Sequence, residues 1–346
     1  MPKAKTTPKK AKSSAKREKK APPRKIKFWI GFDLGGTKML GTVLDENFNI
    51  LGTARKATNG SDGSLKGVKR MITVIQDAMT KANVDPSGLQ GIGVGCPGLV
   101  DSAKGVLLSA PNLGWRNVAL RKRLKSVFKK PVAVLNDVDA GTFGEYKLGA
   151  GKGARSLLGV FPGTGVGAGF VYNGQLVRGR SVSAMELGQI LLPGTHLGAA
   201  EFGAVPLEDL TSRLALASQA GVACYRGQLP DLDKKTKGAL RDIRSKALAA
   251  SFHQGEEAAM IMFRNSIRYL GMGVAIVVNL FAPDQITMGG GLVEEMPQLY
   301  VNALREEVNR YAMPGLAKGI KYSFAKLGGN AVAIGAVSHL QEFGEA

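Results

Sequence analysis

Residues 32–52 read FDLGGTKMLGTVLDENFNILG, and this stretch decides how the first half of the chain folds. Two glycines and a lysine separate two apolar runs, and a second polar turn at Asp45–Asn47 precedes a third run. Short apolar segments that are separated by glycine and polar turns predict strands. The sequence therefore predicts that the domain opens with three consecutive strands.

The turn at residues 33–38 has two interpretations. Its residue types suit a phosphate group, because Gly35 and Gly36 let backbone amides approach an anion, while Thr37 offers a hydroxyl and Lys38 a positive charge. Asp33 adds a carboxylate that can hold the waters of Mg²⁺. The segment is no Walker motif, which needs a longer glycine loop leading into a helix. A plain hairpin turn is the alternative.

The segments that follow alternate between helical and strand patterns. Apolar side chains at helical spacing predict an amphipathic helix through Val68, Met71, Ile72, Ile75 and Met79. After it we expect a buried strand in LQGIGVGCPGLVD (89–101), a basic-faced helix in NVALRKRLKSVFKK (117–130) and a buried strand in PVAVLND (131–137). Alternating strands and helices indicate an α/β fold with a largely parallel sheet and functional residues at the strand ends.

The second half of the chain repeats the opening pattern. Residues 156–179, SLLGVFPGTGVGAGFVYNGQLVRG, again read as strand, glycine turn, strand, short Asn-Gly turn and strand. Two such halves suggest two similar lobes with a ligand cleft between them. Beyond them we expect a charged linker at 228–245, a helix over 256–280, a strand in QITMGGG (285–291) and helices over 293–311 and 331–343.

Two more glycine segments are candidate phosphate sites. The turn containing Gly163, Thr164, Gly165 and Gly167 corresponds in position to the first glycine turn, so the pair can grip a phosphate chain from both sides of a cleft. The glycines Gly289, Gly290 and Gly291 follow a strand and precede a helix, where their amides can face a nucleotide. Packing alone is the other explanation for Gly289, Gly290 and Gly291.

The segment VLNDVDAG ends a buried strand with Asn136 and Asp137. A carboxylate at the edge of a sheet can accept the proton of a substrate hydroxyl as that oxygen attacks a γ-phosphate. Asp137 is therefore the candidate general base. The alternative is that Asp137 or Asp139 only caps a helix.

Three polar positions in apolar surroundings are candidate sugar ligands: Asn112 in APNLGWRN, Glu186 in SAMELGQ and Glu208 in PLEDL. Taken alone, each is as well explained as a surface residue. The three histidines, His196, His253 and His339, form no sequence cluster and are assigned to neither a metal nor catalysis. Cys96 and Cys224 lie far apart, and we expect both to be reduced, buried thiols.

The net charge of +20 is concentrated at the N-terminus, because residues 1–27 contribute +11. This segment has almost no large apolar side chain, so we expect a disordered basic tail. It is either a solubilising arm or an arm that binds a polyanion such as polyphosphate or nucleic acid. Base stacking is not expected, since no aromatic residue lies among the lysines.

The N-terminus lacks the apolar stretch of a secretory signal, and the apolar run Val274–Phe281 is too short to cross a bilayer. We therefore expect a cytoplasmic protein.

Seven motifs in order resemble the ROK family of sugar kinases and sugar-sensing repressors. They are DLGGTK (33–38), GVGCPG (93–98), PNLGW (111–115), NDVDA (136–140), GTGVGAG (163–169), MELG (185–188) and MGGG (288–291). The resemblance implies the two-lobed actin-like ATPase (ribonuclease H-like) fold, with duplicated mixed sheets, flanking helices and a ligand cleft between the lobes. It divides the chain into a tail (1–27), an N-terminal lobe (28–137) onto which the C-terminal helix at about 331–346 packs back, and a C-terminal lobe (138–330).

Carried over to this sequence, the resemblance implies that Asp137 is the base. It implies that the sugar is bound by Asn112, Asn136, Glu186 and Glu208. It also implies that ATP with Mg²⁺ is bound by the two glycine turns and Gly289–Gly291. It also implies that a homodimer is common in the family.

The sequence departs from the family's pattern at one place that bears on zinc binding and on contact with the sugar. The family usually carries Glu-x-Gly-His and a cysteine-rich zinc loop, whereas Gln189 stands here in place of that histidine and no cysteine lies between Glu186 and Glu208. We therefore expect no zinc site, and a substrate contact by Gln189, which can donate and accept a hydrogen bond.

The function that these residues predict is ATP-dependent phosphorylation of a hexose, glucose to glucose 6-phosphate being the first candidate. Polyphosphate as the donor, and another hexose or an N-acetylhexosamine as the acceptor, are alternatives. A further alternative is a non-catalytic sugar-sensing or nucleic-acid-associated protein. The lysine-rich tail is, however, too short and too poor in apolar residues to form a helix-turn-helix domain.

Overall fold

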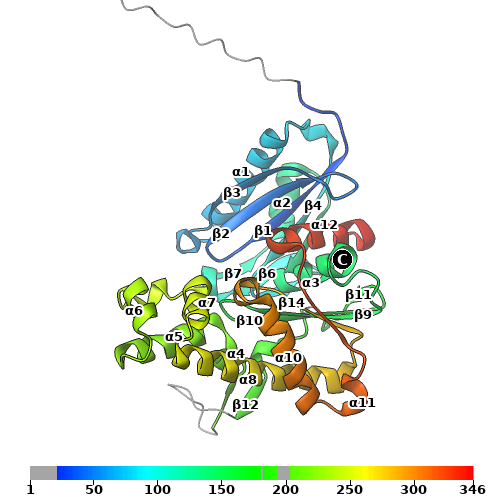
Figure 1. Cartoon of the computed structure of the whole chain (residues 1–346). Coiled ribbons are helices and arrows are strands. Elements are labelled where there is room, and N and C mark those ends of the chain that lie inside the picture. Colours follow the sequence, from blue (N-terminus) through cyan, green and yellow to red (C-terminus); the bar gives the residue numbers. More distant parts are fainter. Residues whose placement is uncertain (1–21, 181, 194–202, 346) are drawn as a thin grey trace, which may run out of the picture.

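A computed structural model describes residues 22–180, 182–193 and 203–345, so most of the predicted basic tail lies outside the described part. The chain forms two lobes, each built around a five-stranded sheet (Figure 1). The first sheet has the order β3-β2-β1-β4-β8. Its strands are β1 (Phe28–Leu34), β2 (Lys38–Leu44), β3 (Ile50–Ala57), β4 (Leu89–Cys96) and β8 (Val132–Asn136).

The second sheet repeats this plan in the order β11-β10-β9-β14-β15. Its strands are β9 (Ser156–Pro162), β10 (Val166–Tyr172), β11 (Gln175–Leu176), β14 (Gln285–Met288) and β15 (Lys321–Phe324). In both sheets the first three strands pair antiparallel, the first two of them across a glycine turn, and the last two strands join in parallel. The expectation of duplicated mixed sheets is confirmed.

Helices cover the sheets as their apolar stripes require. In α1 (Ser64–Ala82) the side chains of Val68, Met71, Ile75 and Met79 are buried against the first sheet, while Ile72 lies at the edge of that core. The last helix, α12 (Ala331–Phe343), packs against β1, β4 and α3 (Asp137–Leu148), which places it between the two sheets (Figure 1). Gly144 of α3 and Gly335 of α12 leave no room for a larger side chain where the two helices cross.

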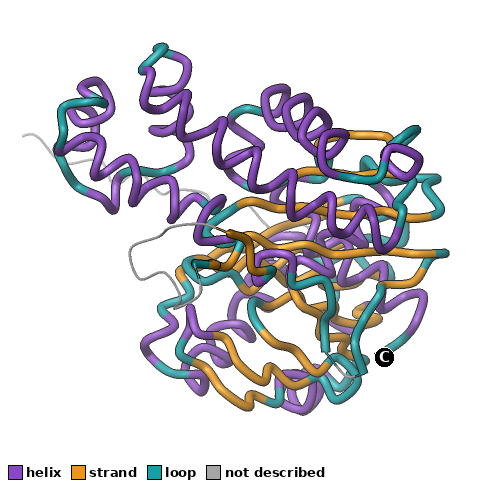
Figure 2. Tube along the Cα trace, turned by 90° about the horizontal axis from the view of Figure 1, so that it is seen from below, coloured by secondary structure: helices purple, strands orange, loops and turns teal. Residues whose placement is uncertain are grey.

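The C-terminal lobe carries most of the helices, which gather on one side of its sheet (Figure 2). They are α4 (Glu208–Thr211), α5 (Arg213–Tyr225), α6 (Pro230–Thr236), α7 (Ser245–His253), α8 (Glu257–Phe281), α9 (Gly291–Glu295), α10 (Pro297–Tyr311) and α11 (Pro314–Ala317). By length and composition α8 could cross a membrane, but 61% of its most apolar window is buried in this lobe. Its apolar character is therefore explained by core packing.

Two sequence-based boundaries were wrong. The basic-faced helix predicted from residue 117 begins later, because Trp115–Val118 forms β7 and α2 covers only Leu120–Phe128. The helix predicted over 293–311 is two helices, since Pro297 lacks the N–H that a continuous helix needs and instead starts α10.

The charged linker predicted at 228–245 is largely helical. It contains α6 and the 3₁₀ turn η5 (Leu240–Asp242). Leu229, Leu232 and Ile243 are buried in the core of the lobe, so the charges mark only the outer face of a packed segment.

Two small sheets were not predicted. β5 (Leu99–Asp101), β6 (Val106–Ala110) and β7 form one, and β12 (Leu191–Pro193) with β13 (Ala204–Pro206) forms the other. The first carries the 3₁₀ turn η3 (Pro111–Leu113) between β6 and β7.

Candidate active site

A cavity of about 560 Å³ lies where the ends of the two central hairpins face each other. Both lobes contribute to it. Among the predicted site residues, the cavity is lined by Gly36, Thr37, Asn112, Asn136, Asp137, Gly163, Thr164, Gly165, Gly167, Glu186 and Glu208. Residues from six separate sequence segments therefore meet at one place.

The first glycine turn joins β1 to β2 and is held by Thr58, which follows β3. The hydroxyl of Thr58 donates to the carbonyl oxygen of Gly35 at 2.7 Å, and its backbone N–H donates to that of Thr37 at 2.8 Å. Gly36 and Thr37 line the cavity, whereas Gly35 and the exposed Lys38 lie beside it. Sequence reasoning missed Thr58, because a lone threonine after a strand carries no motif.

Two carboxylates at this end of the first sheet have raised pKa values. Burial raises the pKa of Asp33 to about 7, with a further increase from the charge of Asp137 and an opposing effect of Arg55. Burial also raises the pKa of Asp137 to about 6, against the effect of the backbone N–H of Val138. The charge of Asp137 disfavours ionisation of Asp33, and a bound cation would relieve this, so Asp33 is an oxygen donor that suits a hard cation such as Mg²⁺.

Asn136 caps α3, which corrects the alternative that Asp137 or Asp139 is the cap. Its Oδ1 accepts from the backbone N–H groups of Val138 at 2.8 Å and of Asp139 at 3.1 Å, while its Nδ2 donates to the carbonyl oxygen of Gly98 at 3.0 Å. Asp137 is thereby the first residue of α3, where the helix N-terminus favours a negative charge. Both ends of the Asn136 amide are engaged by the protein itself.

The predicted sugar ligands Glu186 and Glu208 line the cavity together, and Gln189 lies behind them. The Nε2 of Gln189 donates to Oε1 of Glu208 at 2.7 Å, and Oε2 of Glu208 accepts from the backbone N–H of Val166 at 3.2 Å. Burial and the charge of Glu208 raise the pKa of Glu186. Gln189 contacts Glu208 and does not line the cavity, and a contact of Gln189 with the substrate stays a prediction.

The second glycine turn faces the cavity, but the third glycine segment does not line it. Thr164 accepts from Nη2 of Arg213 at 3.2 Å, a partner in α5 that the sequence did not reveal. A methyl group on Gly289 would lie 2.8 Å from the ring of Phe161, which does line the cavity. Packing against Phe161 is thus one reason for glycine at position 289, and contact with a nucleotide remains a prediction.

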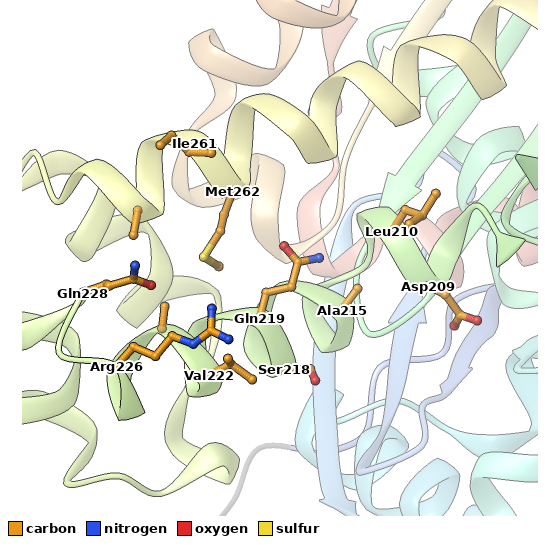
Figure 3. Close-up of a pocket in the computed structure, with 12 residues that line it drawn as sticks. Asp209, Leu210, Ala215, Ser218, Gln219, Val222, Arg226, Gln228, Ile261 and Met262 are labelled. Atoms are coloured by element: carbon orange, nitrogen blue, oxygen red, sulfur yellow. The ribbon is translucent and has the colours of Figure 1, made fainter. Parts of the chain in front are cut away.

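A second cavity of about 480 Å³ lies between α5 and α8, away from the glycine turns (Figure 3). Gln219 of α5 and Met262 of α8 point into it from opposite sides. Its lining combines apolar side chains with a single carboxylate, that of Asp209, and with the polar or basic groups of Ser218, Gln219, Arg226 and Gln228. This composition lacks the paired acids and glycine turns of the first cavity.

In the described ranges, which omit His196, no group of three or more His, Cys, Asp and Glu side chains is placed to hold a metal ion. His339 is fully buried, and Cys96 and Cys224 are buried free thiols. The two cysteines are therefore as predicted, and the absence of zinc stays an expectation.

Comparison with known proteins gives relatives from one family. The sequence model of the ROK family matches residues 29–342. A glucokinase from Streptomyces coelicolor is 30% identical over 90% of this chain and 97% of its own length. A crystal structure of a ROK family glucokinase from Streptomyces griseus, in complex with glucose and AMPPNP, has a TM-score of 0.77 at 30% identity and covers 90% of this chain and 98% of its own.

Similarity extends to regulators as well. A xylose repressor from Bacillus spizizenii is 27% identical over 90% of this chain and 76% of its own length. Nearly the same stretch of this chain is therefore similar to both kinases and repressors. Since the family match covers nearly every described residue and the glucokinases align over almost their whole length, the chain belongs to the ROK family.

Proposed function

We propose that the protein transfers the γ-phosphoryl group of ATP to a hexose, glucose being the first candidate, with Asp137 as the general base. That the chain is a sugar kinase follows from its full-length similarity to glucokinases; the sugar and the residue roles are the proposal. The observation that carries it is the position of Asp137. This carboxylate lies in one cavity with both glycine turns and with Glu186 and Glu208.

The proposed chemistry follows from these positions. Glu186, Glu208 and Asn112 hold the sugar hydroxyls, with Gln189 fixing the orientation of Glu208. Asp137 accepts the proton of the 6-hydroxyl as that oxygen attacks the γ-phosphorus of ATP, and ADP leaves. The amides of the two glycine turns bind the phosphate chain. Asp33 would hold Mg²⁺ through its waters, and the ion would neutralise charge on the phosphates.

A pKa of about 6 suits this role of Asp137. At neutral pH the carboxylate is ionised and ready to accept a proton, yet it is more basic than an exposed aspartate. The observation supports a base more than a purely structural carboxylate, since the helix cap is already supplied by Asn136.

The test is direct measurement of sugar phosphate formed from a panel of hexoses and N-acetylhexosamines, with ATP and polyphosphate as parallel donors. We expect one sugar to be phosphorylated and Asp137→Asn to lower kcat by about 10²–10⁴-fold. The matched control is Asp77→Asn, which removes a carboxylate paired with Lys56 on the surface at 2.8 Å and should leave turnover intact. An Asp137→Asn variant with full activity would refute the mechanism, and a folded protein without activity on any sugar would favour a sugar-sensing role.

A second proposal concerns the basic N-terminus, where polyphosphate is the alternative donor or ligand. Pro23 lies in one groove with Val127 and Phe128 of α2, so the described part of the chain begins beside this basic helix. Deleting residues 1–21 should raise the apparent KM for long polyphosphate and leave that for ATP unchanged. An equal KM for both proteins would exclude a role of the tail in donor binding. We also propose a cytoplasmic homodimer, which sedimentation of the purified protein would test.

A further inference from the structure

The second glycine turn has a basic neighbour that the proposed reaction does not use. Arg213 is the first residue of α5 and is half-buried. Its backbone N–H donates to the carbonyl oxygen of Gly163 at 2.8 Å, and its Nη2 donates to Oγ1 of Thr164 at 3.2 Å. Arg213 therefore contacts this turn through both its backbone and its side chain.

The turn leaves two of its backbone donors unused. The N–H of Gly163 donates to the carbonyl oxygen of Gly165 at 2.8 Å, and the N–H of Val166 donates to Oε2 of Glu208 at 3.2 Å. Within the part of the chain that the structure describes, the N–H groups of Thr164 and Gly165 have no hydrogen-bond partner. Both residues line the cavity between the lobes, where successive free amides can bind an anion.

The hydroxyl of Thr164 is a third donor, and its direction depends on Arg213. A hydroxyl has one hydrogen to donate and two positions that accept. Because a guanidinium group can only donate, Arg213 occupies an accepting position of Oγ1 and leaves the hydroxyl hydrogen for another partner. Thr164 is exposed and lines the cavity, so a phosphate oxygen there can accept this hydrogen. The contact with a cation also polarises the hydroxyl and makes it a stronger donor.

The charges around the cavity give Arg213 a second role. Among the described residues that line the cavity are three carboxylates, those of Asp137, Glu186 and Glu208, and no lysine or arginine. A phosphate chain in this cavity therefore needs positive charge from behind the lining or from a bound cation. Arg213 places such a charge next to Thr164, and within the described ranges no carboxylate forms an ion pair with it. Its charge is thus not already compensated by the protein.

We propose that Arg213 is a positioning residue for the phosphoryl donor, which holds the Thr164 hydroxyl toward the phosphate chain and places a positive charge behind the second glycine turn. This role rests on the proposed function, which places the donor at the glycine turns. The hydroxyl of Thr164 and the N–H groups of Thr164 and Gly165 donate to phosphate oxygens, and Arg213 fixes the direction of the hydroxyl. Arg213 thereby acts on the donor and not on the sugar.

The experiment compares Arg213→Gln with Arg241→Gln, a matched control in the same lobe whose side chain is 89% exposed. Arg213→Gln keeps the backbone N–H that donates to Gly163, so the turn stays attached to α5. AMPPNP binding is measured by calorimetry with Mg²⁺ and without sugar. Arg213→Gln should weaken AMPPNP binding about tenfold or more, the size of effect expected for a hydrogen bond to a charged group. Glucose binding without a donor should be the same in both variants.

Thr164→Val, which removes the hydroxyl and keeps nearly the same shape, tests the route through Thr164. In the double variant the losses of AMPPNP affinity should be less than additive, because the two side chains act in one contact. Arg213→Lys keeps a positive charge and should bind AMPPNP more tightly than Arg213→Gln. In steady-state kinetics Arg213→Gln should raise the KM for ATP and leave the KM for the sugar unchanged, a split that a general loss of structure would not produce.

Wild-type affinity for AMPPNP in the folded Arg213→Gln variant would overturn the proposed role. Equal losses of glucose and AMPPNP affinity would do the same, as would fully additive losses in the double variant. Arg213→Met, which keeps an apolar stem, takes the place of Arg213→Gln should that variant not fold. If the wild-type protein phosphorylates no sugar while Arg213→Gln still loses AMPPNP affinity, the role of Arg213 is upheld and the proposed function is what fails.

Discussion

Replacing Gly144 by alanine is expected to displace α3 from α12 and to slow the enzyme without unfolding it. A methyl group at position 144 would lie 2.5 Å from the carbonyl oxygen of Ala331 and 3.1 Å from the backbone nitrogen of Gly335. Ordinary van der Waals contact begins at 3.4 Å, so the helices must separate by 3.4 − 2.5, about 0.9 Å. Backbone atoms on both sides of the contact leave no flexible side chain to give way.

The energetic consequence is best measured against a second glycine. An alanine in a helix is favoured over glycine by at most about 1 kcal/mol, whereas overpacking of a tight contact costs about 1–3 kcal/mol. Gly315 of α11 has no atom within 4 Å of an added Cβ, so Gly315→Ala experiences only the first effect. The free energy of unfolding of Gly144→Ala should therefore lie about 1–3 kcal/mol below that of Gly315→Ala.

The catalytic consequence follows from the position of Asp137 at the start of the same helix. A displacement of about 1 Å at a reacting group can reduce the rate about 100-fold, which corresponds to about 2.7 kcal/mol. We expect kcat/KM of Gly144→Ala to fall by this order, while Gly315→Ala keeps wild-type activity. Denaturant titration and steady-state kinetics on the two variants provide the comparison. Equal stability and equal turnover would refute the argument that this crossing sets the position of α3.

Three further predictions follow from the site. Because the pKa of Asp137 is raised to about 6, kcat/KM should fall about tenfold per pH unit below pH 6; a flat profile down to pH 5 would contradict its role as base. The pKa of Asp33 is about 7 in the folded protein against an ordinary value of 3.8, so ionisation of Asp33 destabilises the fold as the pH rises from about 4 to 7. Asp33→Asn should therefore raise Tm at pH 8 but hardly at pH 4. A rise in Tm at both pH values would point to another cause. Thr58→Val removes the hydroxyl that donates to Gly35, and the KM for ATP should rise about 2–10-fold in steady-state assays with that for glucose unchanged.

Local patterns predicted much of the fold. The strand–glycine–strand openings of both halves and the stripe in α1 were correct, because the periods of strands and helices are written directly in the spacing of apolar residues. The same patterns failed where one sequence pattern is compatible with two structures. Charged residues at 228–245 read as a linker, although Leu232 shows that a helix with one buried face lies there.

The candidate site divides in a similar way. Motif and position predicted Asp137 and the two glycine turns as site residues, and they line one cavity, but their partners were not predicted. Thr58 and Arg213 reach the site from segments that carry no motif of their own, and Phe161, although it precedes the second glycine turn, was read only as part of a strand. The contact of Gln189 with Glu208 was not predictable either, since it depends on how η4 lies relative to α4.

The sequence by itself determined the family, the order of strands and helices, and the residue types that chemistry on a sugar and a phosphate requires. Only the tertiary structure decided which of these groups share one cavity, that Asn136 rather than an aspartate caps α3, and that Asp33, Asp137 and Asp139 have raised pKa values. The physical reason is the separation along the chain over which each effect acts. Periodicity and turn preference act over a few neighbouring residues, whereas burial and charge interactions depend on groups that come together only when the two lobes pack against α3 and α12.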